Sequence, residues 1–118
     1  MKLSELKEPN FDGVVESAEI MPLQTHLLKK GLSEESIEKF NNLDRDHLVI
    51  WIKIGEASVD AFFMLPTAQG GPKSNLAKLV KMNPSWPDVD LTPKGVGDLV
   101  GQRVKMTADA QGYSRVRL

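Results

Sequence analysis

LVIWIKIGEASVDAFFMLP, residues 48–66, decides the fold, because one hairpin register accounts for every side chain in it. Gly55 suits the first central position of a type II′ turn, where the backbone φ is positive, and this pairs Ile54 with Ala57. Outward from that pair, one face of the hairpin is wholly apolar, with Ile54, Ile52, Ile50 and Leu48 opposite Ala57, Val59, Ala61 and Phe63. The sequence therefore predicts two antiparallel strands whose apolar face lies in the core.

The opposite face of this hairpin combines aromatic rings with charge. Its pairs are Lys53 with Ser58, Trp51 with Asp60, and Val49 with Phe62. Trp51 and Phe62 are diagonal neighbours in this register, close enough to form one aromatic surface beside a cation. Bases of a single strand stack on such rings whatever their sequence, while cations follow the phosphate backbone. We therefore interpret this face as a binding surface.

Composition limits the class of protein. The 118 residues suit one domain, and the 41% hydrophobic content is ordinary for a soluble globular protein. There is no cysteine, which excludes disulfides and thiolate metal sites. No apolar run reaches the roughly 18 residues of a membrane span, and the first ten residues lack the apolar segment of a signal peptide. We therefore expect a cytoplasmic protein without a membrane partner.

The charge is unevenly distributed along the chain, although the net charge is only −1. Residues 1–71 hold 7 basic and 12 acidic groups, whereas residues 72–118 hold 8 basic and 4 acidic groups. A mixed, solvated surface explains this pattern. A basic face that attracts a polyanion to one side of an acidic molecule explains it as well.

The flanking segments supply the other expected elements. Residues 1–10 are polar and aperiodic, which predicts a flexible N-terminal arm before a single domain over 11–118. Phe11–Met21 predicts a first strand, with a bend or bulge near Gly13. In the long connection that follows, Ser33 caps a short helix reaching Leu43.

A second helix and a second hairpin are expected in the C-terminal half. Ser74 is a natural N-cap for a helix over Asn75–Met82. Nearer the C-terminus, a three-residue loop that ends at Gly112 in the left-handed conformation pairs Asp109 with Tyr113. This register places Thr107 opposite Arg115 and Lys105 opposite Arg117 on the outer face.

Lys105 and Arg117 are therefore like charges on neighbouring strands, which costs a few tenths to about 1 kcal/mol. A bound phosphate would compensate for that repulsion. Solvated cations that protect a strand edge from aggregation are an equally good explanation.

The expected order is strand, long loop, strand, strand, helix, strand, strand. It resembles the OB-fold, an all-β, five-stranded Greek-key barrel with a helix between its third and fourth strands. The resemblance covers about residues 11–118 and rests on order and spacing, as in small phage-type and archaeal single-stranded-DNA-binding proteins. It implies that a ligand crosses the second and third strands, between the loops at Pro22–Asp46 and Asp109–Tyr113.

We therefore predict a protein that binds single-stranded nucleic acid, with DNA as the expected ligand and with low sequence specificity. Catalysis and a cofactor are not expected, and the only two histidines, His26 and His47, lack a metal-ligand spacing. The residues assigned to the interface are Trp51, Lys53, Phe62, Arg103, Lys105, Tyr113, Arg115 and Arg117.

Two alternatives remain for the same face. It could hold a protein, as in an OB-like adaptor or an oligomerising subunit, because aromatic residues are enriched at interface cores. Alternatively, Trp51 and Phe62 could be buried under the long first loop. The apolar side chains of that loop need a surface to cover, namely Leu27, Leu28, Leu32, Ile37 and Phe40.

Overall fold

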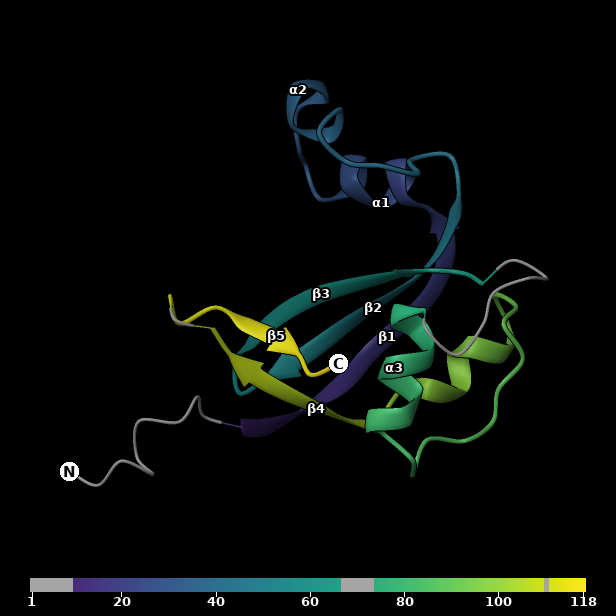
Figure 1. Ribbon diagram of the computed structural model, residues 1–118, viewed down its shortest axis with the longest axis vertical. Helices are drawn as coiled ribbons and strands as arrows, with labels where there is room; N and C mark the ends of the chain where they lie inside the picture. The colour runs from purple at the N-terminus through teal and green to yellow at the C-terminus, as the bar shows by residue number, and fades with distance from the viewer. Residues whose placement is uncertain (1–9, 67–73, 110) are drawn as a thin grey trace.

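The chain forms a five-stranded antiparallel sheet that curls into a nearly closed barrel (Figure 1). The computed structural model describes residues 10–66, 74–109 and 111–118, so residues 1–9 of the predicted arm, 67–73 and 110 lie outside it. The strands are β1 (Asn10–Pro22), β2 (Asp46–Ile54), β3 (Ala57–Met64), β4 (Arg103–Ala108) and β5 (Ser114–Val116). Their order in the sheet is β3-β2-β1-β4-β5, and β5 returns beside β3, which is consistent with an OB-like fold.

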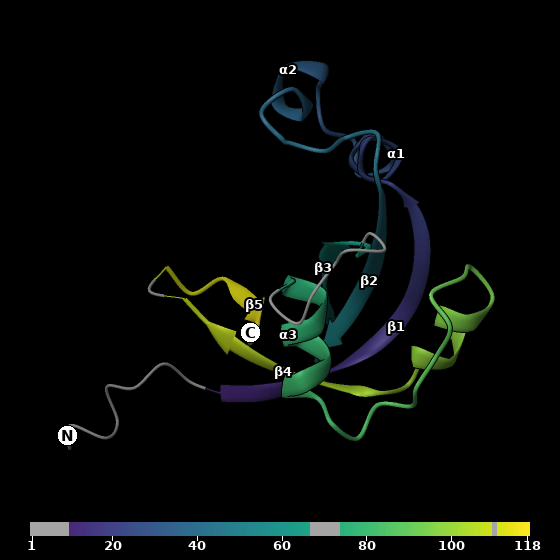
Figure 2. The same cartoon turned by 45° about the vertical axis from the view of Figure 1, so that its right-hand side comes forward.

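Strand β1 is the long, curved element that joins the two halves of the barrel (Figure 2). Its first residues pair with β4 and its later residues pair with β2, and Val14 pairs with both strands. The register with β2 shifts between Val15 and Ser17, so the bulge falls after Gly13 rather than at it. Gly13 has a different role, since a Cβ there would collide with the Ile52 side chain. The bulge and the close approach together allow β1 to curve around the core.

Both predicted hairpin registers are confirmed. Every predicted pair between β2 and β3 is present, and Gly55 has a φ of 62° as a type II′ turn requires. In the second hairpin, Thr107 pairs with Arg115, the Asp109 amide donates to the Tyr113 carbonyl, and Gly112 has a φ of 85°. Turn chemistry and apolar alternation thus determine both hairpins locally.

The interior of the barrel is filled by the apolar face of β2 and β3 and by matching residues of the other strands. The buried core residues are Val15, Ala18, Leu48, Ile50, Ile52, Phe63, Leu76, Leu79, Val96, Leu99, Val104 and Met106. Four of these come from α3 (Asn75–Met82) and η2 (Gly95–Leu99), which therefore complete the core.

Helix α3 matches its predicted bounds, and the Ser74 hydroxyl accepts a hydrogen bond from the Ala77 amide as an N-cap. The connection between β1 and β2 differs from expectation. It contains α1 (Leu23–Lys29), which was not predicted, and α2 (Glu34–Ile37), which is shorter than the expected helix reaching Leu43. The fold is therefore mixed α/β rather than strictly all-β. Within the described ranges, no helix has the length and apolar character needed to cross a membrane.

Candidate nucleic-acid interface

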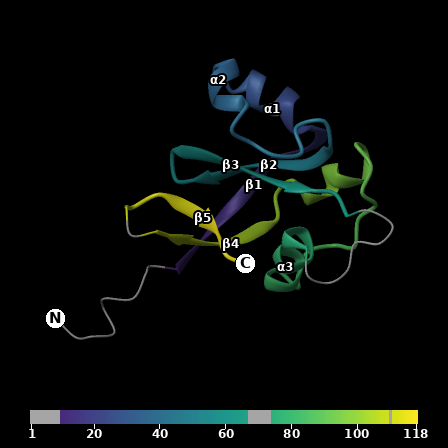
Figure 3. The same ribbon diagram turned by 45° about the horizontal axis from the view of Figure 1, so that its top comes forward.

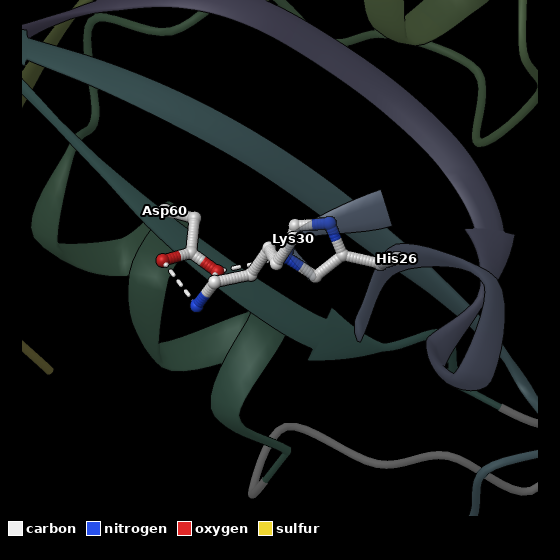
Figure 4. Close-up of polar contacts among 3 residues, drawn as sticks. All are labelled: His26, Lys30 and Asp60. Atoms are coloured by element: carbon white, nitrogen blue, oxygen red, sulfur yellow. Dashed lines mark hydrogen bonds and ion pairs between the residues drawn. The ribbon is translucent and has the colours of Figure 1, made fainter. Parts of the chain in front are cut away.

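Helix α1 lies over the β2–β3 side of the sheet (Figure 3). Its contacts with Trp51 and Phe62 show that it covers part of the aromatic face predicted for binding. Its His26 is 2% exposed, and the imidazole centroid is 6.0 Å from that of Trp51 and 5.9 Å from that of Phe62. His26 Nε2 donates to the Asp60 carboxylate at 2.7 Å, and Lys30 Nζ donates to the same carboxylate at 3.0 Å (Figure 4). These contacts fasten α1 to β3. We call His26, Lys30 and Asp60 the clasp.

The Asp60 carboxylate of the clasp is held in its ionised form. Burial on its own raises the pKa of Asp60, but hydrogen bonds from His26 and Lys30 and the positive charge of Lys30 outweigh it, so the pKa lies below its ordinary value of 3.8. A carboxylate only accepts hydrogen bonds, so His26 Nε2 must carry the hydrogen.

This lowered pKa predicts a pH dependence of stability. Because the pKa of Asp60 is lower in the folded chain than in the unfolded chain, its contribution is fully present above the ordinary value of 3.8 and is lost as pH falls through the lowered folded value. Urea unfolding of the wild type and of Asp60→Asn should therefore show a stability difference that is constant above about pH 5 and shrinks towards about pH 2. A difference independent of pH in that acid range would contradict the role assigned to the carboxylate.

Phe62 belongs to a second apolar cluster, outside the barrel. The cluster consists of buried Leu23, Leu27 and Ile37, with Leu32, Leu43 and Phe62 packed against them. The first loop thus covers Phe62, as the covering alternative supposed. Trp51 is half-buried, and its ring contacts that of His26 edge-on.

The outer face remains open beyond Trp51, towards the β2–β3 turn and β4. Val14 of β1 pairs with Lys53 on one side and with Arg103 on the other, and paired residues in a sheet project from the same face. All three side chains are exposed. The cations of β2 and β4 therefore share one surface, and Trp51 lies two residues from Lys53 on that surface.

Lys105 extends this surface along β4, between Asp12 on β1 and Arg117, which directly follows β5. Asp12 gives Lys105 an acidic neighbour, which offsets the like charge of Arg117 without a bound phosphate. The Arg117 amide donates to the Lys105 carbonyl at 3.0 Å, so the two residues lie opposite each other, as predicted.

Two hydrogen bonds from the segment after α3 fix the backbone of β4 at Arg103 and Lys105. The Trp86 indole Nε1 donates to the Arg103 carbonyl at 2.6 Å, and the Asn83 side-chain oxygen accepts from the Lys105 amide at 3.0 Å. Asn83 is 3% exposed and also donates to the Leu79 carbonyl. The segment after α3 thus holds this part of β4 in place.

The remaining predicted interface residues lie nearer the tip of the second hairpin. Arg115 Nε donates to the Asp109 carboxylate at 2.9 Å, and that carboxylate also accepts from the Gln111 and Tyr113 amides. The backbone hydrogen bond from Tyr113, more than any other contact, lowers the pKa of Asp109. Tyr113 is 66% exposed. Arg115 thus already has an ionic partner, unlike Lys53 and Arg103, for which no ion pair occurs among the described residues.

Two pockets lie outside the aromatic face. A small one of about 220 Å³ includes Asp12, Ser85, Arg103 and Lys105 in its lining. A larger one of about 590 Å³ lies beside α3, and its walls are mostly aliphatic, with Trp86. The lining of the smaller pocket thus combines two cations and a hydroxyl with the carboxylate of Asp12. Within the described part of the chain, no group of three His, Asp or Glu side chains converges as a metal site needs.

The sequence-based prediction missed the clasp. A helical signal was present, because Leu23, His26 and Leu27 follow the i, i+3, i+4 spacing of one buried helix face. The partnership with Asp60 had no such signal, because the two residues are 34 positions apart.

Comparison with known proteins assigns neither a family nor a site to this chain. The chain matches no protein-family model, no curated protein and no solved structure. The OB-like description therefore rests on strand order and pairing, and the site has to be argued from its residues.

Proposed function

We propose that this protein binds single-stranded nucleic acid, with DNA as the expected ligand and with low sequence specificity. The binding path runs over the open part of the outer face, from Trp51 and Lys53 on β2 across β1 to Arg103 and Lys105 on β4. The observation that carries the proposal is the double pairing of Val14, which brings Lys53 and Arg103 to the same face.

The arrangement suits a flexible polyanion. Neighbouring strands are about 4.8 Å apart, so Lys53 and Arg103 are roughly 10 Å apart at their backbones, with the exposed Val14 between them. Long side chains at that spacing can reach separate phosphates of one strand. The Trp51 ring contacts His26 edge-on, and a base can stack on it. Such stacking contributes about 1 to 3 kcal/mol to binding.

The other predicted residues contribute less to the proposed binding. Phe62 is packed under the first loop and supports the surface near Trp51. Arg115 would have to exchange its ion pair with Asp109 for a phosphate, so its net gain is small. Arg117 widens the path beside Lys105, and Tyr113 extends it towards the hairpin tip.

The salt dependence of binding tests the proposed path. Each phosphate contact with a single strand contributes about 0.7 to the slope of log affinity against log salt. Lys53→Gln and Arg103→Gln should each weaken oligo(dT) binding and reduce this slope by about 0.7, and the double variant should reduce it by about 1.4. The matched control is Lys78→Gln, an exposed lysine of α3 outside the path, which should leave the slope unchanged. Equal slopes for the wild type and the double variant would reject the path.

A further inference from the structure

A pocket of about 350 Å³ lies at the far end of β2 and β3 from Lys53, where His47 pairs with Met64. Its lining includes Phe40 and Asn41 from the first loop and Phe62 from β3. It is distinct from the path proposed above, since His47 lies four residues from Trp51 along β2, about 13 Å.

His47 presents an unused hydrogen-bond acceptor at this pocket. Its Nδ1 is 2.8 Å from the Arg45 carbonyl, and a carbonyl only accepts, so Nδ1 carries the hydrogen. Nε2 of the neutral ring then has a free lone pair, and no hydrogen bond to it occurs among the described residues. The residue is 5% exposed, yet no partnerless buried nitrogen is found in the described chain. Nε2 therefore keeps some exposure, and His47 is one of the residues that line the pocket.

The walls around this acceptor are aromatic and amidic. Phe40 is 37% exposed, and its ring meets Phe62 edge-on, with centroids 6.1 Å apart and an interplanar angle of 65°. Asn41 and Asn42, both exposed, also line the pocket and carry amide groups that can accept hydrogen bonds. Rings for stacking, together with amide and imidazole acceptors, are the groups with which proteins recognise splayed-out bases.

We propose that this pocket binds one amino-bearing nucleobase of the bound strand. The base stacks on the exposed Phe40 ring, and its exocyclic amino group donates one hydrogen to His47 Nε2 and the other to an asparagine side-chain oxygen. An amino group fits better than a ring N–H because the pocket offers acceptors from two sides. This inference rests on the proposed function, to which it adds a preference at one base position.

Nucleotide titrations followed by amide NMR test the pocket. The probes are adenosine monophosphate and purine riboside monophosphate, which differ by the 6-amino group. Adenosine monophosphate should shift the amide signals of Asn41, His47 and Phe62, and should bind about 5- to 10-fold more tightly than the purine riboside probe. His47→Asn keeps a donor for the Arg45 carbonyl but removes Nε2, so it should bring the ratio to about 1.

A second variant keeps the test valid if His47→Asn fails to fold. Phe40→Leu alters an exposed ring and should weaken both probes several-fold while leaving their ratio intact. Leu28→Ala is the matched control, because Leu28 is exposed on α1 and is not part of the pocket lining. It should change neither affinity nor ratio.

The outcomes separate this inference from the proposed function. Suppose that oligo(dT) binds with the expected salt slope. If neither nucleotide then shifts the pocket amides, or if the wild type binds both nucleotides with a ratio near 1, the inference is overturned and the proposed function is not. If the nucleotides bind in the pocket with the expected ratio, but oligonucleotide affinity does not depend on Lys53 and Arg103, the proposed path is overturned. The inference about the pocket is then retained.

Discussion

Replacing His26 by alanine should lower the free energy of unfolding by about 2 to 4 kcal/mol and loosen α1 from the sheet. The substitution removes a buried ring that contacts Trp51 and Phe62, and it leaves the partly buried Asp60 carboxylate with Lys30 as its only clasp partner. Loss of packing and loss of a charge-assisted hydrogen bond both contribute to this cost.

Urea unfolding followed by circular dichroism measures this effect, and tryptophan emission reports the exposure of Trp51. The matched control is Leu28→Ala, on the same helix but 52% exposed, which should change stability by no more than about 0.5 kcal/mol. If His26→Ala were as stable as Leu28→Ala, the clasp would not be what holds α1 in place.

Trp51→Ala should weaken oligo(dT) binding by about tenfold or more, because a stacked base contributes about 1 to 3 kcal/mol and each 1.4 kcal/mol is a factor of ten. Trp51 packs on the outside of the sheet and is half-buried, so the fold should persist. A binding titration measures the loss. The control is Val80→Ala, an exposed apolar residue of α3 away from the path, which should bind as the wild type does.

Sedimentation of the same variant separates the nucleic-acid role from the adaptor role. We expect wild type and Trp51→Ala to sediment alike, because Lys53 and Asp60 flank the tryptophan and make the surface amphipathic rather than broadly apolar. Loss of a dimer on substitution, together with no oligonucleotide affinity in the wild type, would favour the oligomerising subunit instead.

The elements that the sequence predicted well are those specified by local chemistry. Gly55 and Gly112 adopt positive φ at the positions required by their turns, and apolar alternation then dictates which residues face each other. Ser74 likewise caps α3 through a contact three residues away. Such short-range signals need no knowledge of the rest of the fold.

The features that the sequence did not predict depend on contacts between distant segments. Pro22 ends β1 as expected, but the residues that follow it form α1 rather than a loop, and the buried side of α1 packs in one cluster with Phe62. The shared surface of Lys53 and Arg103 requires β1 to pair with two strands at once. No local pattern distinguishes that topology from one that places the two cations on opposite sides.

The most direct test of the proposed interface is the intrinsic fluorescence of the wild type and of Trp51→Phe during titration with oligo(dT) at low salt. Trp51 and Trp86 are the only tryptophans, and the Trp86 indole is hydrogen-bonded to the Arg103 carbonyl. We predict saturable quenching in the wild type, most of which disappears in Trp51→Phe, because the base stacks on Trp51. A spectrum that does not change at saturating oligonucleotide, or quenching that persists in full in Trp51→Phe, would contradict the account.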